Sequence, residues 1–321
     1  MQSSHPPTGK IILILSLGIL AIATAPILIR LAMATIVASD ITASGVNAGA
    51  APALSKRSLA LVMAASRLLI VSVILAPNWR TLSPQHYPRS LRLLTLVAGL
   101  CLALHFATWI SSLAYTSIAA STVIVTTNPI WVALLSRFWW QERLRPLTWI
   151  GIGLALAGSL TIGLAEAVPS VAPQPLLGNG FALIGSWTIS LYLVLGRHIQ
   201  TQGVNTAHYT TAVYTVAALG LLPVPWLQGT GYGGYPMSVY GYIVLMALLP
   251  QLVGHTSLNW AVRWLSPTLV TLAVLGEPIG ASLLGYWILD EVPTVTTLGG
   301  GAIVLLGIGL AAWGQRSSAP A

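Results

Sequence analysis

Glu277 is the residue whose type and position most clearly suggest chemistry. It lies inside a long apolar stretch directly before Pro278, and small residues share its predicted helical face, namely Ala273, Ala281 and Gly285. A carboxylate inside a membrane costs roughly 2.5–3.5 kcal/mol on insertion scales, so it requires a compensating interaction. Pro278 also frees a backbone carbonyl, which is tolerated where the backbone lines a cavity. We predict a proton site or a site for a substrate ammonium group; a structural hydrogen bond to a neighbouring helix is the alternative.

Two histidines form a second group of polar residues. His105 and Trp109 share one helical face, as do His255 and Asn259, because residues four apart lie above one another on a helix. Histidine titrates near neutral pH, so proton coupling is one interpretation of this pair. Hydrogen bonding within a bundle of helices is the other. We include all four side chains among the candidate substrate or proton ligands.

Arg67 lies at the centre of another apolar stretch. A guanidinium group at that depth either binds an anionic group or pairs with a carboxylate such as Glu277. Both interpretations remain open from the sequence.

Enzymatic and metal chemistry have little support in the sequence. Cys101 is the single cysteine, so an intramolecular disulfide, a CxxC pair and a zinc cluster are excluded. HExxH, GxSxG and P-loop motifs are absent, and no pair of acidic residues lies within one apolar stretch. We therefore predict no catalytic residues, no metal, no cofactor and no ATP-driven step.

The elements that must position these residues are membrane helices. The 321 residues are 55% hydrophobic and only 6% charged, which leaves too little polar surface to cover a soluble globule. Continuous apolar stretches favour helices over the alternating strands of a barrel. Ten spans are predicted, at roughly 11–32, 59–77, 93–114, 118–137, 147–165, 177–196, 207–226, 239–262, 268–289 and 296–314.

An internal repeat organises the ten spans. Pro129 precedes Glu142 by thirteen residues, and Pro278 precedes Glu291 by the same distance. A repeat of this kind predicts two similar halves, residues 1–166 and 167–321, each with five spans. Because five is an odd number, the second half enters the membrane in the opposite sense, which makes the fold two inverted five-helix repeats. Asn128 is the counterpart of Glu277, so the charge is present in only one copy.

The basic residues indicate the orientation. Ten of the fourteen lie on the side of the N-terminus in this topology, so both termini are predicted to be cytoplasmic, in the plasma membrane if the source is a bacterium. They form no patch interleaved with aromatic residues, which argues against nucleic-acid binding. Residues 33–58 are predicted to form an extended outer loop. Glu142 and Glu291 end their spans at the surface, where we expect them, with the two prolines, to determine the fold or gate a pathway.

Several longer motifs resemble the EamA family of the drug/metabolite transporter superfamily. They are APILIRLA at 25, AASRLL at 64, LALHFATWISSLAYTSIAASTVIVTTNPIW at 102, QERL at 141, GHTSLNWAVRWLSP at 254 and LGEPIGASLLGYWILDE at 275. The resemblance covers almost the whole chain. It implies ten helices around a central cavity, cytoplasmic termini, and export or exchange of small metabolites, often amino acids.

These observations predict a secondary active transporter in the lipid bilayer that moves a small metabolite by alternating access, with protons as a candidate coupling ion. The alternatives are a proton-independent uniporter or channel and an intramembrane enzyme. Saturable counterflow distinguishes a carrier from a channel. Turnover of a substrate without vectorial movement would favour an enzyme.

Overall fold

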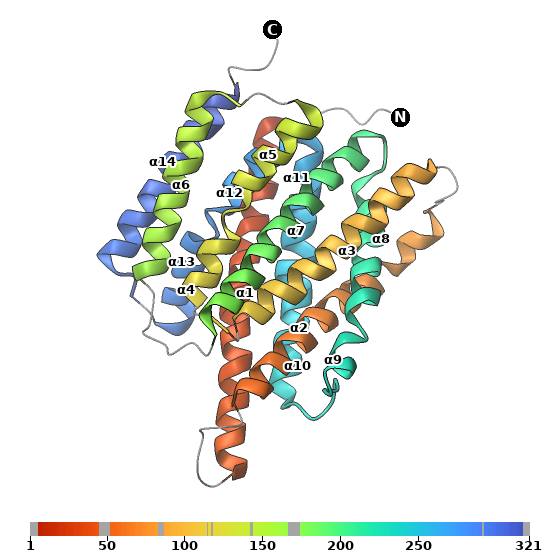
Figure 1. The fold of residues 1–321 in the computed structure, drawn as a ribbon, viewed down its shortest axis with the longest axis vertical. Coiled ribbons are helices and arrows are strands. Elements are labelled where there is room, and N and C mark those ends of the chain that lie inside the picture. The colour runs from red at the N-terminus through yellow and green to blue at the C-terminus, as the bar shows by residue number, and fades with distance from the viewer. Residues whose placement is uncertain are drawn as a thin grey trace.

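The structure is a computed structural model of the chain. It describes residues 6–44, 52–82, 87–113, 115–116, 118–141, 144–165, 174–290 and 292–316. The described residues are almost entirely helical, and none of them lies in a β-strand. The ribbon forms one bundle in which α1 begins and α14 ends at the same end of the molecule (Figure 1).

Each half of the chain contributes five spans. The first half contains α1 (Thr8–Ser44), α2 (Pro52–Leu75) with the 3-10 turn η1 (Ala76–Arg80), α3 (Arg89–Ser112), α4 (Ile118–Val125), α5 (Asn128–Trp140) and α6 (Pro146–Ala165). The second half contains α7 (Pro175–Thr201), α8 (Thr206–Leu221), α9 (Val224–Leu227), α10 (Met237–Met246), the π-helix η3 (Ala247–His255), α11 (Thr256–Trp264), α12 (Pro267–Val274), α13 (Glu277–Leu289) and α14 (Val295–Arg316).

The ten predicted spans are confirmed. Nine helical segments within the described residues are long and apolar enough to cross a membrane. The tenth is the broken span formed by α4 and α5 together. The all-helical class and the two-repeat architecture therefore agree with the sequence analysis.

The predicted outer loop at residues 33–58 is wrong over most of its length. Helix α1 continues to Ser44 and α2 already begins at Pro52. The segment after Met33 contains no glycine or proline before Gly45, so no helix-breaking residue interrupts the helix despite the polar residues. At ~1.5 Å per residue, α1 is longer than the ~30 Å hydrocarbon layer. It extends beyond the rest of the bundle at one end (Figure 1).

Helices of each half pack against helices of the other half. The third and fourth spans of the first half, α3 and α4–α5, pack against α7, which is the first helix of the second half. In the reciprocal contact, the π-helix η3 and α13 pack against α1. Each half therefore completes the other, and the residues at the seam come from both.

The last spans of the two halves, α6 and α14, lie side by side (Figure 1). Glycines permit their close approach: a Cβ atom at Gly151 would lie 2.6 Å from the Gly307 carbonyl oxygen, and one at Gly158 would lie 2.7 Å from that of Gly300. Gly151 and Gly300 are repeat-equivalent, as are Gly158 and Gly307. The pairing thus crosses the copies, as an inverted repeat requires.

Candidate functional site

The fourth span of each half is broken near its middle. Helix α4 ends at Val125 and α5 begins at Asn128; in the second half, α12 ends at Val274 and α13 begins at Glu277. Pro129 and Pro278 follow directly, in the first turn of the new helix, where a missing N–H is tolerated. The break places Glu277 at a helix N-terminus, and the positive end of the helix dipole favours its negative charge.

Arg67, on α2, is buried with 1% of its surface exposed. Its Nε and Nη2 atoms donate to Gln251 Oε1 at 3.1 and 2.8 Å. The guanidinium carbon lies 3.9 Å from the centre of the Phe106 ring, so the cation also contacts an aromatic face. Two hydrogen bonds to one polar partner and contact with one ring thereby hold a charge in the interior of the bundle.

Gln251 belongs to the π-helix η3, which contains Pro250. Proline cannot donate the N–H that a regular helix needs at that point, and a widened turn accommodates the defect. The counterpart span α3 is an α-helix throughout. The π-helix therefore exists in one copy only, and it carries the glutamine that binds Arg67.

The structure brings Glu277 near Arg67 without a hydrogen bond between them. The two charges interact electrostatically, while the hydrogen bonds of Arg67 go to Gln251. Glu277 is half-buried and is thus less enclosed than Arg67. Arg67 and Glu277 come from different repeats.

The predicted histidines both lie beside this pair. His105 Nδ1 is 2.9 Å from the carbonyl oxygen of Gly185, and its ring stacks on Trp109 with the centres 5.8 Å apart. His255 meets the Phe106 ring edge-on at 5.4 Å. Both histidines interact electrostatically with Arg67. We call Arg67, Gln251, Glu277, His105 and His255, with the Phe106 ring between them, the polar cluster.

Asn259 forms hydrogen bonds with neighbouring helices. Its Oδ1 accepts from the Tyr192 hydroxyl at 2.8 Å, and its Nδ2 donates to the Tyr214 hydroxyl at 3.1 Å. Its backbone carbonyl accepts from Gln200 at 2.8 Å. The amide is fully buried and joins α7, α8 and α11, so it is better placed to hold these helices together than to bind a solute.

Asn128 lies in a neutral environment. Its backbone carbonyl oxygen accepts a hydrogen bond from the Ser190 hydroxyl at 3.3 Å, and the indole N–H of nearby Trp131 donates to the Thr127 hydroxyl at 3.1 Å. The repeat-equivalent positions of the two breaks are therefore chemically distinct. Glu142 and Glu291 lie outside the described residues.

Sequence reasoning missed Gln251, Phe106 and Tyr214. Gln251 had a usable signal, because an uncharged polar residue directly after a proline inside an apolar span marks an irregular helix with a buried partner. Phe106 and Tyr214 had none, since aromatic residues are common in apolar helices.

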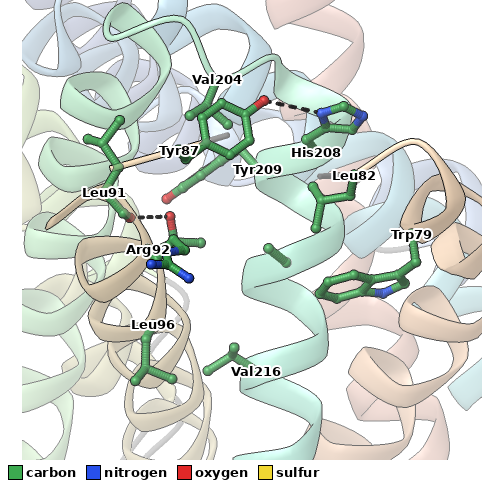
Figure 2. A pocket seen from close by; sticks show the side chains of 12 residues that line it. Trp79, Leu82, Tyr87, Leu91, Arg92, Leu96, Val204, His208, Tyr209 and Val216 are labelled. Atoms are coloured by element: carbon green, nitrogen blue, oxygen red, sulfur yellow. Dashed lines mark hydrogen bonds between the residues drawn. The ribbon is translucent and has the colours of Figure 1, made fainter. Parts of the chain in front are cut away.

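A pocket of about 170 Å³ lies away from the polar cluster, between η1 and the N-terminal parts of α3 and α8. Figure 2 shows Trp79, Leu96 and Val216 around it, with Arg92 on one wall and the His208 ring pointing to the Tyr87 hydroxyl. His208 Nδ1 is 3.4 Å from that hydroxyl, and its Nε2 is 3.2 Å from Thr81 Oγ1. These contacts join the two halves at one end of the bundle.

Comparisons with known proteins agree with the repeat. Residues 9–164 and residues 176–313 each match the model of the EamA-like transporter family. The uncharacterized transporter YdfC of Bacillus subtilis (strain 168) is 26% identical over 194 residues, which cover 60% of this chain and 61% of that protein. A probable terminal-alkyne amino-acid exporter of Streptantibioticus cattleyicolor is 26% identical over 189 residues, covering 59% of this chain and 62% of that protein.

The alignments thus span about three fifths of these relatives. A solved crystal structure shares the fold with a TM-score of 0.69 at 20% identity, over 98% of this chain and 100% of the other.

Proposed function

This chain belongs to the EamA-like transporter family, and from that premise we propose that it is a secondary active transporter of small metabolites such as amino acids, acting as an exporter or exchanger. The carrying observation is the polar cluster, in which Arg67 from the first repeat meets Gln251 and Glu277 from the second. Inverted repeats that share a site near their middle can expose it to each side of a membrane in turn. The similarity to a probable amino-acid exporter supports this solute class.

We propose Glu277 as the residue that couples charge to movement. Arg67 offsets the negative charge of its carboxylate, so binding a proton or an ammonium group at Glu277 changes the charge balance of the seam between the repeats. A change of that kind can favour one arrangement of the repeats over the other. No P-loop is present in the sequence, and a solute or ion gradient is the proposed source of energy.

A uniporter that works without protons, or a channel, is the second candidate. The half-buried Glu277 would then contribute charge to a pathway without titrating during transport. An intramembrane enzyme has less support, because the polar cluster lacks a nucleophile with a positioned base.

Transport in proteoliposomes tests the proposal. We expect saturable counterflow, in which unlabelled internal solute accelerates uptake of label, and a loss of its pH dependence in Glu277→Gln. Asn128→Asp, at the repeat-equivalent position, is the matched control and should leave the pH dependence in place. Unchanged flux and pH dependence in Glu277→Gln would exclude the coupling role, and non-saturable flux would favour a channel.

A further inference from the structure

Two buried hydrogen-bond donor atoms of the polar cluster have no acceptor within the described part of the chain. Nε and Nη2 of Arg67 both donate to Gln251 Oε1, whereas Arg67 Nη1 is buried and has no acceptor within hydrogen-bond distance in the described part of the chain. The Gln251 Nε2 atom is likewise buried with no such acceptor. Buried donors without acceptors are costly, and in native proteins each of them calls for an explanation.

The orientation of the Gln251 amide follows from chemistry. Its oxygen must face Arg67, because a guanidinium group offers only donors. The amide nitrogen is therefore turned away from Arg67 and presents N–H groups. The hydroxyl of Tyr214 lies in the vicinity of that amide, but outside hydrogen-bond geometry, and Asn259 and Thr256 already engage it.

The missing partner must be an acceptor, and the positive charge of Arg67 favours an anion. A carboxylate has two oxygens that can accept from two neighbouring donors, which suits a guanidinium group beside an amide. The guanidinium carbon lies 3.9 Å from the centre of the Phe106 ring, and two of its nitrogens donate to Gln251, so the donors are held in place before a ligand arrives.

Glu277 supplies the complementary charge. It interacts electrostatically with Arg67 and forms no hydrogen bond with it, so its carboxylate can pair with a positive group of a ligand while Arg67 and Gln251 donate to a negative one. Glu277 and His255 are half-buried, whereas Arg67 and Gln251 are 1% and 0% exposed. The donors are therefore at the closed side of the polar cluster and the acid is at the more open side.

We infer that Arg67 and Gln251 form the carboxylate subsite of the transporter, and that its ligands are α-amino acids whose ammonium group faces Glu277. This inference rests on the proposed function and names the group that the solute must carry. It predicts that an amide or an amine of the same shape is rejected, because neither has an anionic acceptor for the two donors.

The first step is to show that a mixture of the twenty protein amino acids stabilises the purified protein. A matched set of analogues of the best-binding amino acid, for example leucine, then gives the sharpest test. The set contains the best-binding amino acid, its amide, its decarboxylated amine and its deaminated acid; for leucine these are leucine, leucinamide, isoamylamine and 4-methylpentanoate. Ligand-induced thermal stabilisation measures binding without requiring transport. We expect the amino acid to bind at least about tenfold more tightly than its amide or amine, since a site built around a polar group rejects analogues that lack it.

Two variants assign the preference to these residues. Gln251→Glu replaces the free donor by an anion that pairs with Arg67, so the selectivity for the amino acid over its amide should fall at least about tenfold. Gln315→Glu is the matched control, because Gln315 Oε1 also accepts a hydrogen bond, from Ser266 at 2.8 Å, outside the polar cluster. Arg67→Lys keeps the charge and removes the forked donors, and it should weaken binding of the amino acid more than binding of the amine.

The outcomes separate this inference from the proposed function. Equal binding of the amino acid and its amide, no stabilisation by any amino acid, or unchanged selectivity in Gln251→Glu would overturn the inference. If the inference were overturned in this way, saturable counterflow of a solute other than an amino acid would still support the proposed transporter function. Selective binding of amino acids without vectorial flux would support the subsite and contradict the transporter.

Discussion

At the break between α4 and α5, hydroxyl groups of α7 hydrogen-bond the interrupted backbone, whereas the break between α12 and α13 has no equivalent hydroxyls on the helix that packs against it. Ser186 donates to the Val125 carbonyl at 3.0 Å, and Ser190 donates to that of Asn128 at 3.3 Å. Gly18 of α1 packs against Ser257, as Gly185 of α7 packs against the repeat-equivalent Thr108. This alignment places Ile19 and Ala23 of α1 at the positions of Ser186 and Ser190.

The second break is packed by small groups instead. Helix α13 approaches α1 so closely that a Cβ atom at Gly280 would lie 2.9 Å from Ala23 Cβ. The counterpart of Gly280 in the first half is Trp131. One break is thus closed by hydroxyls and a tryptophan, and the other leaves its polar group, Glu277, beside the charge of Arg67. The same helix break is therefore held by hydrogen bonds in one copy and carries a charged residue in the other.

The largest expected effect comes from moving the carboxylate between the copies. In the double variant Asn128→Asp, Glu277→Gln the total charge is conserved, but the buried Arg67 loses its countercharge. We expect flux to fall at least about 100-fold, equivalent to roughly 2.7 kcal/mol. Initial rates in proteoliposomes check this. Near-normal flux in the double variant would show that the two breaks are interchangeable.

Closer packing of the second break should have the next largest effect. Gly280→Ala adds a methyl group against Ala23, and overpacking of this kind costs about 1–3 kcal/mol. We expect a lower melting temperature in detergent and slower transport. Ala23→Gly in the same chain should restore both, since it removes the opposing methyl group. Failure of that rescue would mean that Gly280 is required for a reason other than its contact with α1.

Much of the scaffold was predictable because it follows from local composition. Apolar length predicted the ten spans, and Pro278 predicted a disturbed backbone beside Glu277. The spans 118–137 and 268–289 were nevertheless predicted as continuous helices, and both are broken. The odd number of spans in each repeat predicted the inverted arrangement. Each of these signals is contained within a short window of the sequence, so no knowledge of packing was needed.

The details of the polar cluster were not predictable from such windows. Arg67 and Gln251 are 184 residues apart, and nothing local to either shows that they meet. The sequence predicted Glu277 as a partner that pairs with Arg67, but the hydrogen bonds of Arg67 go to Gln251, which lies on the π-helix at Pro250. The helical extension of α1 beyond Met33 was not predicted, because the polar residues of this segment suggested a loop although no glycine or proline precedes Gly45.

A smaller effect is expected from the hydroxyls at the first break. Ser186→Ala removes the donor to Val125 and a contact with Thr127 at 3.2 Å. The unpaired carbonyl should lower the free energy of unfolding by about 1 kcal/mol, while the preference among solutes is unchanged. Thermal melting and a competition assay measure the two quantities. A change of solute preference would place the first break in the binding site and weaken the contrast between the copies.

The smallest expected effects come from the histidines, which also differ between the copies. His105→Phe leaves the Gly185 carbonyl without its imidazole partner, but Thr188 Oγ1 still donates to that oxygen at 3.1 Å, so we expect a loss below about 1 kcal/mol. Besides its electrostatic interaction with Arg67, His255 meets the Phe106 ring edge-on and forms no hydrogen bond within the described part of the chain. His255→Phe can keep the ring contact, so its stability should change by less than about 0.5 kcal/mol. Both variants should retain the pH dependence of flux, because the proposed coupling carboxylate is intact. If His255→Phe alone abolished that dependence, the titrating group of the second copy would be the histidine, and Glu277 would remain as the countercharge of Arg67.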